Sequence, residues 1–318
     1  MYAVRRCGGC LNENPGVWVD WVGWCGAAGE VAARRSRDGA TGATGTRRSA
    51  GQVGSALGNA EVAWSPRDGK LGADADGADA VVHLAGVSIA DGRWNKERKQ
   101  ALLDSRVAAT HRLIGALKEL KRPPQIFIAA SAIGFYGNRG DEELTESSST
   151  GSDFLAQLCQ DWEVESARAA EFGARVVILR FGVILAKNGG ALPKMVLPFR
   201  FCAGGPVGSG RQWMSWIALQ DVTGIVAYAL SNANMTGTFN IVAPQPARNA
   251  DFARALGHVL RRPAIFPTPS FALRLALGEM ADALLLSSQR VLPRRIEEAG
   301  YRFAQPELGG ALRSVLTT

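Results

Sequence analysis

The chain has 318 residues, of which 47% are hydrophobic, and a formal net charge of +7. This is long and apolar enough for one large α/β domain and a smaller appendage. Lys and Arg are scattered in short pairs, so we expect no nucleic-acid partner. A small phosphate-bearing ligand or ordinary solvated faces account for the charge equally well.

Cysteine usage and hydropathy further narrow the class of protein and its cellular compartment. Cys7 and Cys10 have metal-like spacing, but no second pair completes a ligand set, so we expect no metal and a reducing compartment. The N-terminus has no secretory apolar core, and no later run reaches about 18 apolar residues. We therefore expect a soluble, cytoplasmic protein with no membrane partner.

The first 58 residues fit no regular pattern. They are rich in Gly, Arg and Ala and lack the apolar periodicity of the later sequence. Residues 16–31 (GVWVDWVGWCGAAGEV) place three Trp three apart and predict neither a good strand nor a good helix. Residues 39–45 (GATGATG) match a dinucleotide-binding glycine pattern literally. Since no apolar strand precedes them and no apolar helix follows, we do not assign them as a phosphate-binding loop.

From about residue 78, buried strands alternate with helices. The predicted strands are residues 78–86 (ADAVVHLAG), 125–137 (QIFIAASAIGFYG) and 175–186 (RVVILRFGVILA), and the predicted helices are 95–120 and 152–172. Ser152 and Asp153 are candidate N-cap residues of the second helix. The β-α-β-α-β order predicts a Rossmann-like α/β fold, a doubly wound parallel sheet with helices on both faces. Ligands bind beyond the carboxyl ends of such strands, so residues 83–86, 131–137 and 180–184 should meet at one crevice.

Seven motifs resemble a known family over roughly residues 60–315. They are GADAVVHLAG, GRWNKERKQALLDSRVAAT, SAIGFYGNRGDEELTE, DFLAQLCQDWE, LRFGVILAKNGGALPKM, GGPVGSGRQWMSWIALQDV and LALGEMADALLLSSQRVLPRRIEEAGYRF. The chain resembles the extended short-chain dehydrogenase/reductase proteins, in the epimerase family branch of NAD-dependent epimerase/dehydratase type. The tail, residues 267–313, resembles that branch's mostly α C-terminal domain of unknown function.

This resemblance implies a domain order and a cofactor site. Residues 59–245 would form the NAD(P)-binding domain and residues 246–318 the small C-terminal domain, with 1–58 anomalous. The residues implied near the cofactor are Leu84, Ala85, Gly86, Arg106, Ala130, Phe181 and Gly182, with Ser131 near the nicotinamide.

The family begins with a strand and a G-x-x-G-x-x-G turn, which suggests an explanation for the Trp triplet. Trp has a single codon, TGG, and reading one base later converts it to a glycine codon, so W-x-x-W-x-x-W becomes G-x-x-G-x-x-G. We therefore favour the hypothesis that residues 1 to about 50 are translated out of frame. The alternative is a genuine, divergent N-terminus whose Trp residues pack on a surface.

The usual acid of this superfamily, a Tyr followed four residues later by Lys, is absent. The corresponding helix has Leu155 and Cys159, or Phe154 and Leu158 one residue earlier. Ser131 is present, and Tyr136 is the nearest alternative donor, so we select these two as catalytic candidates. Tyr136 also fits a structural residue that closes the turn at the strand end, and this interpretation is favoured over catalysis. Cys159 lies on an apolar helix face without a His partner and is expected in the core.

Three further features have two interpretations each, and a fourth has one. Arg106 could meet substrate or cofactor inside the crevice or form a salt bridge on the helix surface. Trp213 and Trp216 could line a substrate pocket or pack in the core, and Asp221 is expected to cap the next helix. Residues 141–143 (DEE) predict a solvated acidic turn, or a carboxylate base at the crevice mouth.

Two functional classes remain. The first is an NAD(P)-dependent oxidoreductase or epimerase acting on a small molecule, either a sugar nucleotide or another carbonyl compound; the second is a dinucleotide-binding protein without turnover. NADP(H) is favoured over NAD(H) by an Arg that the shifted frame allows at the end of the second strand. Without its phosphate loop the chain as written would be inactive, poorly soluble and without measurable NADP(H) affinity. A homodimer is also compatible with this class.

Overall fold

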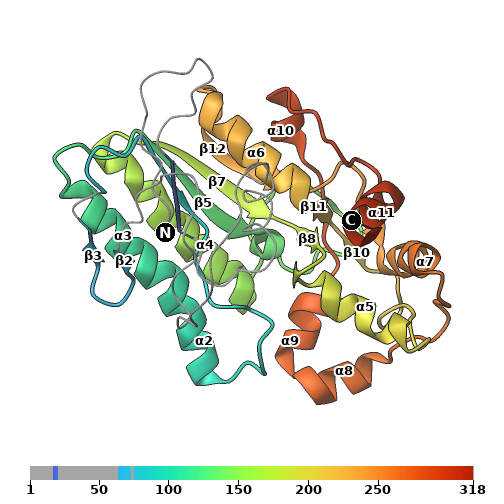
Figure 1. The fold of residues 1–318 in the computed structure, drawn as a ribbon. Coiled ribbons are helices and arrows are strands. Elements are labelled where there is room, and N and C mark those ends of the chain that lie inside the picture. The colour runs from blue at the N-terminus through green and yellow to red at the C-terminus, as the bar shows by residue number, and fades with distance from the viewer. Residues whose placement is uncertain (1–16, 21–63, 73–74, 318) are drawn as a thin grey trace, which may run out of the picture.

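The computed structural model describes residues 17–20, 64–72 and 75–317, and of residues 17–20 only the backbone (Figure 1). The strands are β1 (Val17–Asp20), β2 (Trp64–Ser65), β3 (Lys70–Leu71), β4 (Ala80–His83), β5 (Ile126–Ala132), β6 (Glu143–Leu144), β7 (Arg175–Phe181), β8 (Val183–Ala186), β9 (Gly189–Gly190), β10 (Trp213–Met214), β11 (Trp216–Ala218), β12 (Gly237–Ile241), β13 (Ala247–Arg248) and β14 (Arg290–Val291).

The helices follow the same order. They are α2 (Lys96–Leu103), α3 (Ala109–Lys118), α4 (Phe154–Ala167), α5 (Leu192–Arg200), α6 (Leu219–Ser231), α7 (Asn249–Leu260), α8 (Ser270–Leu277), α9 (Glu279–Ala281), α10 (Arg294–Glu298) and α11 (Leu308–Thr317). Short turns of 3₁₀ or π geometry are η3 (Asp104–Ala108), η4 (Ile133–Tyr136), η5 (Arg168–Phe172) and η6 (Asp282–Leu286). Among the described helices, none is long and apolar enough to cross a membrane.

The main sheet has five parallel strands in the order β1-β4-β5-β7-β12. The predicted Rossmann-like α/β class is therefore confirmed. The sequence predicted no strand in residues 16–31, whereas β1 lies there and pairs with β4. Residues 21–63, which include the 39–45 glycine motif, lie outside the described residues.

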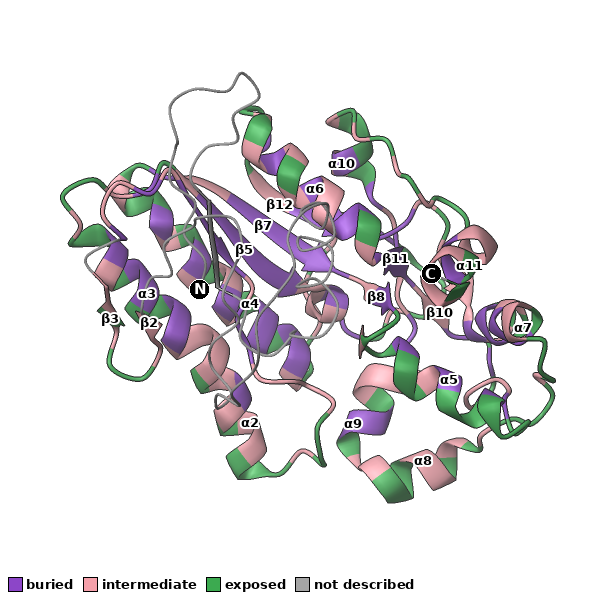
Figure 2. Cartoon of the chain, in the orientation of Figure 1, coloured by how far each residue is buried: buried purple, intermediate pink, exposed green. Residues whose placement is uncertain are grey.

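Alternating side chains of the strands form two cores, one on each face of the sheet. Val81, Phe127 and Ala129 pack with the apolar face of α3, whereas Val82 and Ile128 pack with α6 on the opposite face. Figure 2 shows the central strands buried and the outer helix surfaces exposed.

The predicted third strand is divided at Gly182. Residues Arg175–Phe181 remain in the main sheet as β7, while β8 leaves it and pairs with β11 in a second, smaller sheet. A Cβ on Gly182 would lie 2.4 Å from the Ser215 carbonyl oxygen, so only glycine allows the chain to pass at this crossing. The C-terminal part returns to the main domain through β14, which pairs with β6.

Candidate functional site

Three neighbouring strands each carry one polar residue at the same level of the main sheet. Ser131 in β5 lies beside Arg180 in β7, and Arg180 lies beside Asn240 in β12. Because side chains alternate along strands, all three project from the face that α3 and α4 cover. They are buried near the carboxyl ends of the strands, where open parallel sheets bind ligands.

Glu163 of α4 joins this row from the helix side. Its Oε1 accepts a hydrogen bond of 2.6 Å from the Ser131 hydroxyl. Arg180 donates to both carboxylate oxygens, from Nε and from the terminal nitrogen, at 2.7 Å each. The two side chains are only 6% and 11% exposed, so solvent screens this pair little. Burial is the largest influence on the pKa of Arg180 and acts to lower it, but the hydrogen bonds and charge of Glu163 leave it raised.

Tyr136 lies at the far end of the same network. Its side chain is fully buried, and its hydroxyl donates to Asn240 Oδ1 at 2.7 Å while accepting from Arg180 at 2.9 Å. Burial raises the pKa of the phenol despite the nearby guanidinium. These contacts fit the structural interpretation, in which Tyr136 is held in the interior of the protein. Its hydroxyl would contact a substrate directly only if these hydrogen bonds broke.

Arg106 lies in the π-helical turn η3 and is folded back over the end of β4. Its guanidinium donates to the Val87 carbonyl at 3.0 Å and lies 5.4 Å from the Trp162 ring centroid. A Cβ on Gly86 would come within 2.9 Å of the guanidinium carbon, so the glycine makes room for the cation. No carboxylate among the described residues pairs with Arg106, so these residues do not support the helix-surface salt bridge. Burial lowers the pKa of Arg106 to about 10, which still leaves it charged at neutral pH.

The α4 residues at the positions of the usual Tyr and Lys carry no acid or base. Asp153, and not Ser152, caps α4, since its Oδ1 accepts from the Ala156 amide at 2.9 Å. Leu155 is buried, and burial raises the pKa of the buried Cys159 thiol to about 12. Cys159 is thus a neutral core residue, as predicted, and no imidazole activates it among the described contacts.

The remaining cofactor candidates differ in their surroundings. Ala85 and Ala130 are buried small residues at the carboxyl ends of β4 and β5, and Leu84 packs partly buried beside them. Phe181 contributes its ring to the core between the sheet and α6. Gly182 is explained by its contact with Ser215, so its small size needs no cofactor.

The two tryptophans have different roles. Trp216 is fully buried and belongs to the core, which is one of the two roles that the sequence predicted for it. Trp213 is half-buried, with the guanidinium groups of Arg248 and Arg290 4.4 and 4.8 Å from its ring centroid. Its indole N–H donates to Asp141 at 2.8 Å, and this hydrogen bond is the main cause of the lowered pKa of that exposed carboxyl.

The ion-pair and hydrogen-bond partners of residues 141–143 and of Asp221 show what these carboxylates do. Asp141, Glu142 and Glu143 all form ion pairs at the surface, with Arg248, Arg139 and Arg290 respectively. The prediction that Asp221 caps a helix is wrong, because Ala218 occupies the N-cap position of α6. Asp221 instead accepts from the backbone amides of Ala304 and Gln305 and so ties the C-terminal segment to α6.

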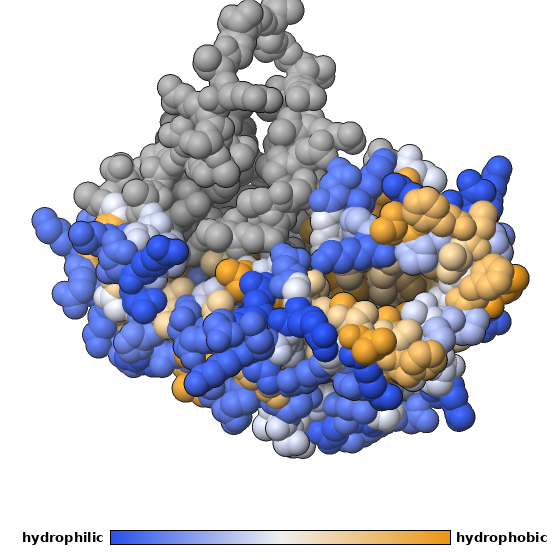
Figure 3. Space-filling view, turned by 90° about the horizontal axis from the view of Figure 1, so that it is seen from below, coloured by the Kyte–Doolittle hydropathy of each residue, from blue (hydrophilic) through white to orange (hydrophobic). Residues whose placement is uncertain are grey.

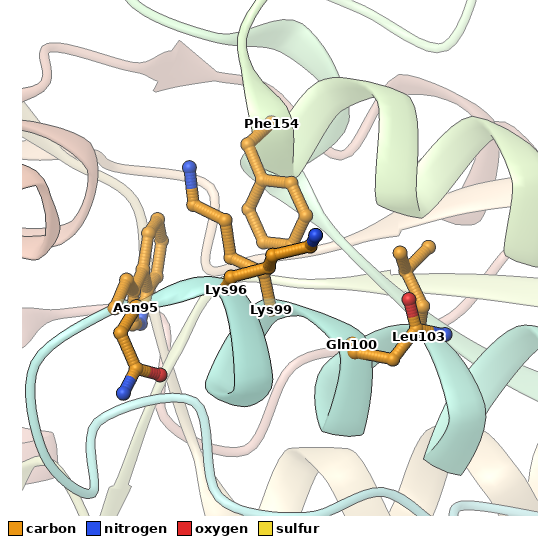
Figure 4. Close-up of a pocket in the computed structure, with 7 residues that line it drawn as sticks. Asn95, Lys96, Lys99, Gln100, Leu103 and Phe154 are labelled. Carbon is orange, nitrogen blue, oxygen red and sulfur yellow. The ribbon is translucent and has the colours of Figure 1, made fainter.

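A hollow of about 450 Å³ lies along α2 (Figure 4). Trp94, Lys99 and Phe154 line it, and Lys99 Nζ lies 4.9 Å from the Phe154 ring centroid. Neither Ser131 nor Arg106 borders it, so it is distinct from the polar row. Among the described residues, no cluster of three or more His, Cys, Asp or Glu could hold a metal ion.

The parallel sheet, the small residues at its carboxyl edge and the polar row define a protein with a Rossmann-like fold, the fold in which dinucleotides bind at this edge of the sheet. The chain belongs to the NAD dependent epimerase/dehydratase family, whose model matches residues 41–242. A second model, a domain of unknown function (DUF1731), matches residues 268–315. The family resemblance seen in the sequence is therefore confirmed.

Related proteins agree with this assignment. An epimerase family protein of Mycobacterium leprae is 40% identical over 290 residues, which covers 85% of this chain and 94% of that protein. The crystal structure of human epimerase family protein SDR39U1 with NADPH is 37% identical, with a TM-score of 0.72, over 76% of this chain and 82% of that one. A nucleoside-diphosphate sugar epimerase from Corynebacterium glutamicum is 38% identical, with a TM-score of 0.64, over 80% of this chain and 49% of that one.

Sequence reasoning missed Glu163, Arg180 and Asn240. A signal for one of them was present, because Arg180 is the charged residue inside the apolar run VVILRFGVIL and a buried charge requires a partner. The identity of that partner depends on which helix covers the strand, and the local pattern does not contain this information.

Proposed function

We propose that this fold serves an NADP(H)-dependent oxidoreductase or epimerase acting on a small carbonyl compound or sugar nucleotide. The observation that carries the proposal is the Ser131 hydroxyl, held by Glu163 at the carboxyl end of β5. Two related structures support it, since one protein was solved with NADPH and the other is described as a nucleoside-diphosphate sugar epimerase.

The described residues fit the nicotinamide side of a dinucleotide. Ala85 and Ala130 are small buried residues at the carboxyl edge, Gly86 makes room for Arg106, and Arg106 is a partly buried cation without a described carboxylate partner. Arg106 would attract a phosphate or carboxylate oxygen of the bound molecule. When bound, the dinucleotide would supply the hydride chemistry.

Ser131 would orient a substrate hydroxyl by accepting a hydrogen bond from it. Its own proton points to Glu163, so the lone pairs of its oxygen are available to a substrate donor. Glu163 is held by Arg180 and acts through Ser131, which makes it a positioning residue. Tyr136 remains the second catalytic candidate, although its hydroxyl is engaged by Asn240 and Arg180.

The second candidate function is dinucleotide binding without turnover. Leu155 and the neutral Cys159 thiol favour it, because neither supplies an acid or base beside Ser131. The two functions differ in one measurement, the sustained loss of NADPH absorbance when carbonyl compounds and sugar nucleotides are added.

The reading frame of the N-terminal segment determines which form of the chain should be assayed. We propose that residues 1 to about 50 derive from a shifted reading frame, and that restoring the frame restores a glycine-rich phosphate loop. Sequencing the coding DNA across codons 10–62 tests this directly, because a missing or extra base must be found there.

The binding of NADPH is then measured by nicotinamide fluorescence for the chain as written and for the frame-restored chain. Binding by the restored chain alone supports both proposals, and binding by both chains contradicts the shifted frame. If neither binds, the cofactor assignment is wrong.

Turnover is then measured with whichever form of the chain binds NADPH. Ser131→Ala should lower NADPH oxidation, with Ser148→Ala as a control at a turn hydroxyl outside the site. An unchanged rate in Ser131→Ala and in Tyr136→Phe would refute the catalytic assignment.

A further inference from the structure

Six large apolar side chains are exposed in one region of the C-terminal half. Their exposed fractions range from 53% to 77%, and they are Leu197, Phe201, Ile265, Phe266, Phe271 and Leu275. They lie on α5 and the turn after it, on the segment after α7, and on α8. Single exposed apolar residues are ordinary in soluble proteins, but a contiguous group marks a surface that contacts something.

Backbone contacts place the three segments side by side. Gly204 bridges Ala264, and Val207 bridges Thr268, so the turn after α5 runs along the segment that leads into α8. The Phe266 amide donates to the Gly204 carbonyl at 3.1 Å. On α8 itself, Phe271 and Leu275 are four residues apart and share one helix face. Figure 3 shows apolar side chains gathered on the C-terminal side of the molecule around a hollow. We name this surface the α5–α8 face.

The same segments are strongly basic. Residues 187–220 and 252–278 hold eight Lys and Arg and no Asp or Glu, namely Lys187, Lys194, Arg200, Arg211, Arg254, Arg261, Arg262 and Arg274. Lys194, Arg254 and Arg274 pair with Asp91, Asp251 and Asp282, which lie outside these segments.

Two of the basic residues lie directly beside the exposed aromatics. Arg200 precedes Phe201 in the chain, and Arg262 reaches the Cys202 sulfur at 3.8 Å. Among the described residues, no carboxylate lies within ion-pair distance of Arg200, Arg261 or Arg262. These unpaired guanidinium groups give the surface a local positive charge.

We propose that the α5–α8 face binds the surface of an anionic lipid membrane. Exposed Phe and Leu side chains enter the boundary between headgroups and acyl chains, while neighbouring Arg and Lys side chains contact anionic headgroups. A second copy of the same face is a poor occupant, because a two-fold contact would bring like charges together. This contact is peripheral and needs no spanning helix, so the search for long apolar runs in the sequence did not find it.

Vesicle flotation on a density gradient tests the proposal, because vesicle-bound protein rises whereas aggregated protein sinks. The full chain should float with phosphatidylcholine vesicles that contain phosphatidylglycerol and stay below with phosphatidylcholine alone. Added salt should weaken flotation by screening the basic side chains. The double variant Phe201→Ser/Phe271→Ser should partition about tenfold more weakly, since it loses two inserted rings.

Matched variants separate this surface from general charge and apolarity. Val164→Ser removes a 60% exposed apolar side chain on α4 and should float like the wild type. Arg200→Gln/Arg262→Gln should lose affinity for the anionic vesicles, whereas Lys118→Gln/Arg122→Gln, at exposed positions on the α3 side, should not.

Failure of the wild type to float, or equal flotation of the double aromatic variant, overturns the proposal. If neither the wild type nor the double aromatic variant floats, and the wild type forms an oligomer that the variant does not, the face is assigned to a protein contact instead. NADPH binding is not involved in any arm, so the outcome does not depend on the proposed function.

Discussion

The Glu163–Arg180 pair is the residue-level feature on which the polar row depends. Glu163→Gln keeps the shape of the side chain but leaves the Arg180 charge buried without a counter-charge. Removing one partner of such a pair costs about 3 kcal/mol, and we expect that loss of unfolding free energy in urea titrations. Glu171→Gln, in an exposed pair with Arg168, should have no measurable effect. Equal effects of the two variants would show that solvent screens the Glu163 pair as well.

Cys159 and Cys202 provide a test of burial at the same scale. Burial raises the pKa of Cys159 to about 12, so its thiol is protonated at neutral pH, whereas Cys202 is exposed to reagents. Iodoacetamide with peptide mapping should therefore modify Cys202 before Cys159, and reach Cys159 only as the pH approaches 12 or after denaturation. Rapid neutral-pH alkylation of Cys159 would reveal a stabilised thiolate and reopen its role as a nucleophile.

The residues that sequence reasoning identified and those it missed differ in a physical way. Ser131 was found because it ends an apolar strand in a family motif, and Cys159 because a lone thiol on an apolar helix face is expected in the core. Glu163 was missed because a carboxylate on an amphipathic helix is ordinarily solvated. Its burial follows from α4 lying over Arg180, which is a tertiary contact.

At the scale of elements, Gly182 controls where the chain leaves the main sheet. Gly182→Ala would place a Cβ 2.4 Å from the Ser215 carbonyl and 2.7 Å from Val242. Overpacking of this kind costs about 1–3 kcal/mol, so we expect a lower melting temperature and a poorer soluble yield. Gly115→Ala is the control, because open space surrounds that helical position and alanine should stabilise it by about 0.5–1 kcal/mol. Identical melting temperatures would show that β8 moves aside without cost.

Local patterns predicted three central strands and two helical segments between them, but not β1 or the crossing at Gly182. The run 175–186 was predicted to be one strand because its apolar residues are continuous. The partners of β7 are β5 and β12, whereas β8 pairs with the adjacent β9 and with β11, which lies more than 30 residues later in the chain. Asp221 was misassigned for the same reason, since its partners Ala304 and Gln305 are distant in sequence.

At the scale of the whole molecule, the N-terminal segment contributes one described strand to the sheet. All four side chains of β4 are buried, and β1 pairs with β4 along its full length from Val17 to Asp20. Without a neighbour on that side, β4 would become an edge strand with unpaired N–H and C=O groups. The parallel sheet therefore depends on a segment whose sequence does not resemble the family.

Deleting residues 1–63 tests this dependence, with deletion of residues 1–15 as a control that retains β1. We expect the longer deletion to aggregate with rising concentration in light scattering, and the β4 amides to exchange faster with deuterium. The control should match the full chain in both measurements. If the longer deletion stays monodisperse with slowly exchanging β4 amides, β1 is not needed to complete the sheet.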